Sequence, residues 1–125
     1  MDLLIVLHAH LPWLRGSERG ELEERWLFEA LWECYLPLLE ILDRAAARGQ
    51  RDVLTLSLSP TLLAMLADPG YQRGFGAFVE ALDAVAARAE ADLGPGPKAA
   101  AIAHHRVRLA AARARFEGAG GDVAA

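Results

Sequence analysis

Residues 3–7 form an unbroken apolar run, Leu3-Leu4-Ile5-Val6-Leu7, and two histidines, His8 and His10, follow it. A short run of branched apolar residues is typical of a strand that is buried on both faces. Such strands belong to parallel sheets, in which ligands bind beyond the carboxyl ends of the strands. Side chains alternate along a strand, so His8 and His10 share one face. The pattern predicts a first strand near Leu3–His8, with both imidazoles at its open end.

A second stretch alternates strictly between apolar and polar positions. Leu54, Leu56 and Leu58 take one face, and the opposite face is formed by Val53, Thr55, Ser57 and Ser59. This alternation predicts a strand near Val53–Ser59. Because a long helical segment links the two strands, we expect them to be parallel neighbours. The polar face suits either the wall of a site or tight packing of small hydroxyls, and both interpretations stay open.

Four stretches place apolar residues at steps of three and four, the period of a helix. They are Glu21–Arg48, the residues after Ser59-Pro60, Tyr71–Leu93 and Lys98–Glu117. Asp68-Pro69-Gly70 separates the second stretch from the third, and Gly94-Pro95-Gly96-Pro97 separates the third from the fourth. Pro37 removes a hydrogen bond from the first helix at a cost of about 3 kcal/mol, which predicts a kink or a break. Gly49 ends that helix. Trp26, Phe28 and Trp32 lie off its main apolar stripe, so we expect it to be covered on more than one side.

These elements predict an α/β fold with two parallel strands and about four helices. Two parallel strands do not make a stable sheet without neighbours, because parallel sheets contain several strands covered on both faces. Residues 1–125 therefore resemble the opening βα units of a larger α/β barrel, incomplete before its third strand.

Composition restricts the class of protein. The 125 residues are 54% hydrophobic and 24% charged, with a net charge of −4, so there is no basic footprint for nucleic acid. A single cysteine, Cys34, excludes an internal disulfide and fits a reducing compartment. No apolar stretch is long enough for a membrane span, and Asp2 replaces the basic start of a signal peptide. We expect a cytoplasmic protein without nucleic-acid or membrane partners.

The histidines carry the candidate chemistry. His8 is still flanked by the apolar run and suits packing as well as function, whereas His10, beside Pro12 and Trp13, favours function. A second pair, His104 and His105, is adjacent on a helix, so these side chains diverge and do not share a metal ion.

Several stretches in order along the chain resemble glycoside hydrolase family 57, most closely its 1,4-alpha-glucan branching enzymes. They are Leu7-His8-Ala9-His10-Leu11-Pro12-Trp13, Trp26-Leu27-Phe28-Glu29-Ala30, Glu33-Cys34-Tyr35-Leu36-Pro37-Leu38-Leu39, Thr55-Leu56-Ser57-Leu58-Ser59-Pro60 and Gly121-Asp122-Val123. The chain departs from the family at Ser57, where relatives usually carry glycine, and in its alanine-rich residues 98–116.

The resemblance implies a distorted seven-stranded (β/α) barrel that acts on α-1,4-glucans in carbohydrate metabolism by a retaining mechanism. Such enzymes use two carboxyl groups about 5 Å apart. In this family both carboxyl groups would lie beyond Ala125, so this chain alone would be inactive and needs the remainder of the catalytic domain as its partner. No metal or other cofactor is implied. The resemblance assigns sugar binding next to the scissile bond to His10, membership of the same motif to His8, and an aromatic wall to Trp13.

Two alternatives remain. His-x-His at the end of a first barrel strand also begins the metal site of amidohydrolases, which later histidines and carboxylates complete. The chain could instead be a helical interaction module or a truncated, non-catalytic remnant whose strands pair with another chain.

Overall fold

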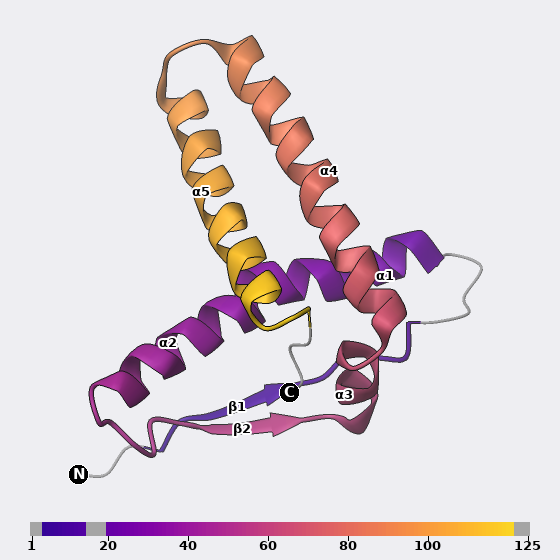
Figure 1. Ribbon diagram of the computed structural model, residues 1–125, viewed down its shortest axis with the longest axis vertical. Helices are drawn as coiled ribbons and strands as arrows, with labels where there is room; N and C mark the ends of the chain where they lie inside the picture. Colours follow the sequence, from indigo (N-terminus) through magenta and orange to yellow (C-terminus); the bar gives the residue numbers. More distant parts are fainter. Residues whose placement is uncertain (1–3, 15–19, 122–125) are drawn as a thin grey trace.

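The computed structural model describes residues 4–14 and 20–121. Within them the order of elements is β1 (Val6–Ala9), α1 (Gly20–Ala30), a π-helical segment η1 (Leu31–Tyr35), α2 (Leu36–Ala47), β2 (Thr55–Leu58), α3 (Pro60–Leu66), α4 (Pro69–Leu93) and α5 (Pro97–Gly118). The strands form one layer, α1, η1 and α2 run across it, and α4 and α5 project from them as a long hairpin (Figure 1). The α/β class and the two strands are as the sequence predicts.

The two strands are parallel neighbours, as predicted. Val6 pairs with Thr55, Leu7 with Leu56, His8 with Ser57 and Ala9 with Leu58. The regular pairing is shorter than the predicted strands, although the Thr55 amide also donates to the Ile5 carbonyl at 2.9 Å and the Ser59 amide to the Ala9 carbonyl at 3.0 Å. The short ladder thus fixes the register around the histidines. The predicted start of the first strand, Leu3, lies outside the described residues.

The expectation that β1 is buried on both faces is wrong for this chain. Leu4, Ile5 and Val6 are 76%, 43% and 57% exposed, and Leu7 is 38% exposed. The physical reason is that the described helices cover one face of a two-stranded sheet, so the other face and the outer strand edges meet solvent. The apolar run therefore has more hydrophobic surface than the described part of the chain covers.

The long first helix is interrupted just before Pro37, where a kink or break is predicted. The Leu36 amide donates to the Leu31 carbonyl, five residues back, so the helix widens into one π turn before the proline. A π turn inserts one extra residue and accommodates the missing donor of the proline. The helix ends as predicted at Gly49, whose φ is +72°. There the Gly49 and Gln50 amides close the last turn on Ala46 and Ala45.

The hydrophobic core lies between α1, η1, α3 and the base of the α4–α5 hairpin. Phe28 and Trp32, predicted to be covered, are buried, whereas Trp26 remains 52% exposed. The buried set is Leu14, Leu27, Phe28, Leu31, Trp32, Leu36, Leu62, Met65, Leu66, Tyr71, Phe75, Val79, Leu109, Ala112 and Phe116. The core therefore sits on the helix side of the sheet and holds the base of the hairpin against η1.

The helix α4 begins two residues before the predicted Tyr71. The Asp68 carboxylate accepts the Gly70 amide at 2.7 Å, and Pro69 occupies the first turn. Asp68-Pro69-Gly70 was expected only to separate two helices, but an acidic cap followed by proline is also a helix start. The cap on α3 is as predicted, because the Ser59 hydroxyl accepts the Leu62 amide at 3.3 Å.

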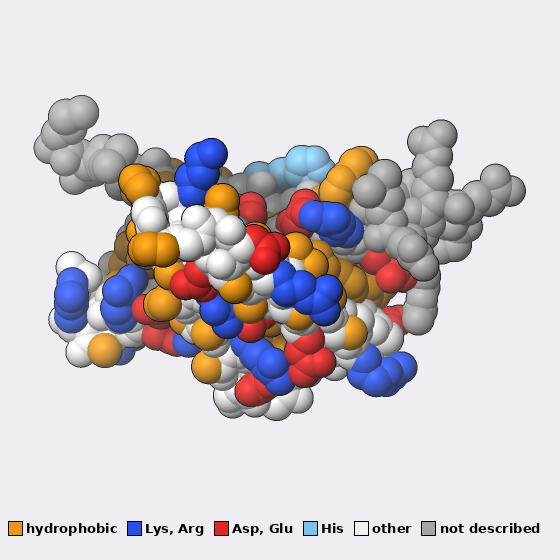
Figure 2. All heavy atoms as spheres, turned by 90° about the horizontal axis from the view of Figure 1, so that it is seen from above, with side chains coloured by type: hydrophobic (Ala, Val, Ile, Leu, Met, Phe, Trp, Pro, Cys, Tyr) orange, Lys and Arg blue, Asp and Glu red, His pale blue; other side chains and the backbone are white. Residues whose placement is uncertain are grey.

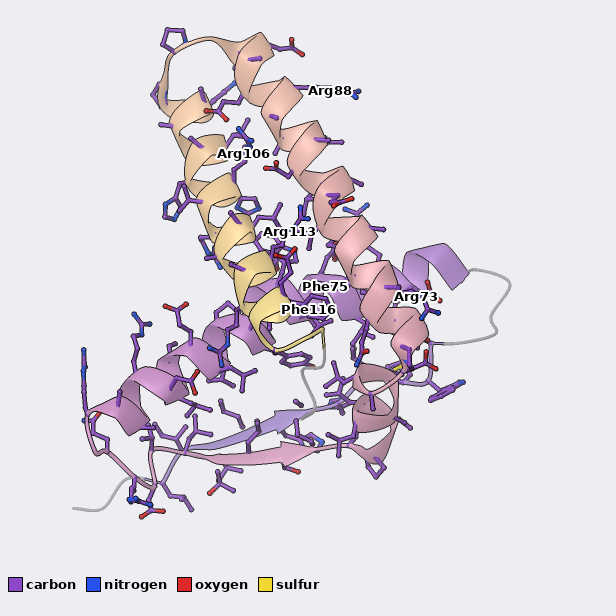
Figure 3. All side chains as sticks on the ribbon, in the orientation of Figure 1. Arg73, Phe75, Arg88, Arg106, Arg113 and Phe116 are labelled. Carbon is purple, nitrogen blue, oxygen red and sulfur yellow. The ribbon has the colours of Figure 1, made fainter. Side chains whose placement is uncertain are left out.

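The hairpin is held by an aromatic contact at its base and by ion pairs further along. The rings of Phe75 and Phe116 meet edge to face at 4.8 Å. Arg106 on α5 donates to Asp83 at 2.8 Å and to Glu90 at 3.0 Å, both on α4. Figure 3 shows Arg106 between the two helices. The hydrogen bond from Arg106 lowers the pKa of Asp83. Seen from above, the hairpin intersperses basic and acidic side chains without a patch of one sign (Figure 2).

In the part of the chain that the structure describes, no helix combines the length and the apolar character needed to cross a membrane.

Candidate functional site

His8 and His10 lie on one face of the sheet at its carboxyl end, as the alternation of the first strand predicts. Their imidazole rings stack with centroids 5.1 Å apart and an angle of 28° between the ring planes. Both side chains are exposed. Among the described residues the His8 ring is not part of the core.

Ser57 completes this face from the second strand. It pairs with His8 in the parallel register, and its Oγ lies 3.0 Å from His8 Nδ1. Two imidazoles and a hydroxyl offer both donors and acceptors over a short distance. The three side chains, which we call the His8–His10–Ser57 face, suit a ligand that carries several hydroxyl groups.

The chain that leaves β1 is tied to the start of α3. The Thr61 hydroxyl donates to the Leu11 carbonyl at 3.0 Å, and the Ser59 hydroxyl lies 3.1 Å from the Thr61 hydroxyl. The ends of the two strands are thereby fixed to each other on the side of the sheet where His10 lies. The polar residues that follow β2 thus hold the exit of β1 in place.

Trp13 follows the histidines at the same end of the sheet and is 52% exposed, whereas the next residue, Leu14, is 2% exposed and anchors the segment in the core. Trp13 is thus an accessible aromatic surface on an anchored segment. The structure brings His8 and His10 into contact and leaves Trp13 beside them in sequence without a ring contact to either among the described residues.

The strands also border an apolar groove of about 350 Å³. The strand segments contribute Leu7, His8, Ala9, His10, Leu56 and Leu58, and Tyr35 is one of the residues contributed by η1 and α2. Burial raises the pKa of Tyr35, and the neighbouring Cys34 adds to the shift. Apart from the two histidines, most of the residues that line this groove are apolar.

The second histidine pair lies away from the sheet. On α5, the His105 ring meets Trp32 edge to face at 4.8 Å, and the Arg108 guanidinium lies 5.8 Å from the Trp32 ring centroid. Among residues 4–14 and 20–121, no three His, Cys, Asp or Glu side chains are close enough to hold a metal ion.

Ser57 is the functional candidate that sequence reasoning did not select. Alternation placed it on a polar face, but the register that puts it opposite His8 is a property of the pair of strands. One feature of the sequence did single out Ser57: it is a serine within the second predicted strand, at a position where the family resemblance predicts glycine.

The chain is an α/β protein similar to the alpha-glucan branching enzymes of glycoside hydrolase family 57. In particular, 95% of the chain superposes on the GH57-type branching enzyme from the hyperthermophilic archaeon Pyrococcus horikoshii, with a TM-score of 0.85 and 28% sequence identity. No protein-family model matches the chain.

Curated relatives give the same result. Two probable 1,4-alpha-glucan branching enzymes from strains of Mycobacterium tuberculosis are each 40% identical to the chain over 65 residues, which is 52% of its length. A 1,4-alpha-glucan branching enzyme of Thermococcus kodakarensis is 32% identical over 78 residues, or 62% of the chain. The resemblance predicted from the sequence is confirmed.

The match covers a small part of each relative. The chain spans 12% of the length of these curated relatives and 22% of the Pyrococcus horikoshii structure. The comparisons therefore show that this chain is similar to one segment of the branching enzymes.

Proposed function

We propose that this chain is part of a retaining enzyme acting on α-1,4-glucan, of the branching or related glucanotransferase and amylase type, and that the His8–His10–Ser57 face binds sugar hydroxyls. The observation that carries the proposal is the stacked pair of exposed imidazoles, 5.1 Å apart, at the carboxyl end of a parallel strand pair. Ligands bind at this end of α/β sheets, and imidazoles pair well with vicinal hydroxyls. The similarity to branching enzymes supports an α-glucan as the substrate.

The proposal assigns residues 1–125 to the N-terminal part of a seven-stranded (β/α) catalytic barrel, with β1 and β2 as its first strands. The exposure of Val6 and Leu7 supports this assignment, because further strands and helices would cover these side chains. The nucleophile and the acid/base carboxyl group are then supplied by later strands of the barrel. The role of this segment is to bind and orient the sugar, since it holds neither catalytic carboxyl group.

Trp13 has a defined place in this proposal. An exposed aromatic ring on an anchored segment provides an apolar surface against which a sugar ring can lie, and the buried Leu14 limits its movement. His10 contacts the sugar next to the scissile bond, and His8 lies beside it. A cytoplasmic location belongs to the same proposal and is supported by the single, unpaired and exposed Cys34.

The proposal is tested by NMR of the imidazole signals while maltoheptaose is added to the 125-residue chain. We expect the His8 and His10 signals to shift with saturation. The signals of His104 and His105, on α5, should stay in place and serve as an internal control. Cellohexaose, with β linkages, should shift the sheet histidines less at equal concentration.

Two results would contradict the proposal. One is the absence of any maltoheptaose effect on His8 and His10 when the spectrum shows a folded chain. The other is an equal shift of all four histidines, because that pattern reports a change of medium instead of a binding site.

A further inference from the structure

We propose that Ser57 is a positioning residue for His8: its hydroxyl donates to His8 Nδ1 and thereby fixes the orientation and the tautomer of the ring. The benefit to glucan binding rests on the proposed function, whereas the effect on His8 does not. Neither the family resemblance nor the comparisons give a role to this serine.

The backbone register brings the two side chains together. His8 lies opposite Ser57, and the flanking pairs Leu7 with Leu56 and Ala9 with Leu58 hold the strands in this alignment. The distance of 3.0 Å between Ser57 Oγ and His8 Nδ1 is that of a hydrogen bond. Because both ends of the contact stand on paired strands, little backbone freedom separates them.

The contact has two possible forms, because a hydroxyl both donates and accepts: either the Ser57 hydroxyl donates to His8 Nδ1, as we propose, or Nδ1–H donates to the hydroxyl. In a neutral imidazole one nitrogen donates and the other accepts, and the partner of one nitrogen selects the tautomer. Within the described chain, His8 Nδ1 is the hydrogen-bond partner of the Ser57 hydroxyl. When the hydroxyl donates to Nδ1, the proton of the neutral ring stays on Nε2.

The second nitrogen of the His8 ring, Nε2, is then left for a further partner. The His10 ring stacks on the His8 ring at 5.1 Å, so the two imidazoles act as one surface. Under the proposed function, His8 Nε2–H donates to an oxygen of the same sugar that His10 contacts. Without Ser57 the His8 ring is free to rotate and to exchange tautomers, so part of the binding free energy is spent on ordering it.

The experiment measures the imidazole nitrogen shifts of His8 in the 125-residue chain, under alkaline conditions in which the ring is neutral. We compare the wild-type chain with Ser57→Ala and Ser57→Thr, since threonine keeps the hydroxyl and suits a strand. Thr55→Val is the matched control, because Thr55 occupies the same face two residues earlier and pairs with Val6 instead of a histidine. Ser57 is exposed, so its replacement leaves the core intact.

We expect the Nε2–H tautomer to dominate in the wild-type, Ser57→Thr and Thr55→Val chains. Ser57→Ala should give a mixture of tautomers, with averaged ring signals. An Nδ1–H tautomer in the wild type, or an unchanged tautomer in Ser57→Ala, overturns the proposal. An equal effect of Thr55→Val also overturns it, because that result assigns the change to the strand in general.

Binding of maltoheptaose separates this inference from the proposed function. Loss of one neutral hydrogen bond that orients the ring corresponds to a weakening of about threefold to tenfold in Kd for Ser57→Ala, restored by Ser57→Thr. If Ser57 controls the tautomer but maltoheptaose shifts neither sheet histidine, the proposed function fails and the positioning stands. If maltoheptaose shifts both histidines while Ser57→Ala leaves the tautomer and Kd unchanged, the positioning fails alone.

Discussion

At the scale of single residues, the two sheet histidines are accessible groups that face one another. His8 is held by Ser57 on one side and stacks on His10 on the other. His10 stands beyond the last paired residue, Ala9, and so lies closer to the open end where a substrate enters. This difference makes His10 the stronger candidate for contact with the reacting part of a sugar.

The corresponding prediction concerns His10→Ala in a complete enzyme, made by replacing the matching segment of the Pyrococcus horikoshii branching enzyme with this chain. An unmade hydrogen bond in a desolvated site costs about 1–3 kcal/mol, or roughly tenfold to a hundredfold in rate. If the bond strengthens in the transition state, His10→Ala lowers kcat by this factor and leaves Tm nearly unchanged, since the ring is exposed.

The measurement is branching of amylose by the chimera, with kcat, KM and Tm recorded for each variant. His104→Ala is the matched control, because His104 is an exposed residue of α5, and it should change none of the three. An active chimera in which His10→Ala leaves kcat unchanged would remove the sugar-binding assignment of this residue next to the scissile bond.

The sequence predicted part of this site because part of it is local. A strand has a period of two, so the common face of His8 and His10 follows from their spacing alone. The partner of His8 does not follow, because register is set between strands: a slip of one residue places Leu56 or Leu58 opposite His8 in place of Ser57. The Ser57 contact therefore required the three-dimensional pairing.

At the scale of elements, the structure departs from the sequence patterns where packing between elements decides. The position of the break before Pro37 was predictable from the missing amide, but its form as a π turn was not. Trp26 was expected to be covered and is exposed, because a helix pattern shows which side is apolar and not what lies against it. The burial of β1 was overestimated for the same reason.

Two glycines in the first turns of α4 provide a prediction about helix packing. A Cβ at Gly74 would lie 2.8 Å from Cζ of Phe28 on α1, whereas a Cβ at Gly76 has no atom within 4 Å. Overpacking costs about 1–3 kcal/mol and exceeds the roughly 1 kcal/mol that alanine gains over glycine in a helix. Gly74→Ala should therefore destabilise the chain by about 1 kcal/mol, and Gly76→Ala should stabilise it by up to about 1 kcal/mol.

Urea unfolding of both variants beside the wild type measures this difference. The two substitutions share their chemistry and their helix, so each controls for the other. Equal changes of the same sign would show that α1 and α4 do not approach each other as closely as the structure has them.

The ion pairs of the α4–α5 hairpin lead to a prediction about pH. The hydrogen bond from Arg106 lowers the pKa of Asp83 below its ordinary value of 3.8. A carboxyl group with a lowered pKa in the folded state stabilises the fold above its unfolded pKa, and this contribution disappears as the pH falls through the folded pKa. Asp83→Asn should therefore reduce the stability of the fold at neutral pH. It should also make the loss of stability below about pH 4 smaller than in the wild type.

Thermal unfolding between neutral pH and about pH 2 checks this expectation over the range in which carboxyl groups titrate. Asp92→Asn is the control, because Asp92 is an exposed residue of the same helix for which no ion pair occurs among the described residues. If Asp92→Asn changes the acid limb as much as Asp83→Asn does, the ion pair with Arg106 is not the cause.

At the scale of the whole molecule, the helical layer and the sheet layer differ in how much of their apolar surface is buried. The helical layer has a continuous core that joins α1, η1, α3, α4 and α5. The sheet layer has strands whose apolar side chains remain more than one-third exposed, including Leu7, Leu56 and Leu58. The described helices thus share a buried core, whereas the open face and the outer edges of the sheet are not covered by other elements of the described chain.

This imbalance leads to the last prediction, that the 125-residue chain alone neither branches nor hydrolyses amylose. A retaining mechanism requires two carboxyl groups about 5 Å apart beside the sugar. The His8–His10–Ser57 face holds imidazoles and a hydroxyl. Among the described residues, the acids in ion pairs lie on α1, α2 and the α4–α5 hairpin, as in the pairs Glu29–Arg25, Asp43–Arg115 and Asp83–Arg106.

The measurement is product formation from amylose by the purified chain, beside the chimera of the His10 experiment as a positive control. We expect turnover by the chimera and none by the chain, even where the chain binds maltoheptaose. The variant His10→Ala distinguishes a real activity from a contaminant, because a contaminating amylase is unaffected by it. Turnover by the chain that disappears in His10→Ala would show that the sheet histidines work without the remainder of a barrel, and the proposed division of labour between this segment and later strands would be wrong.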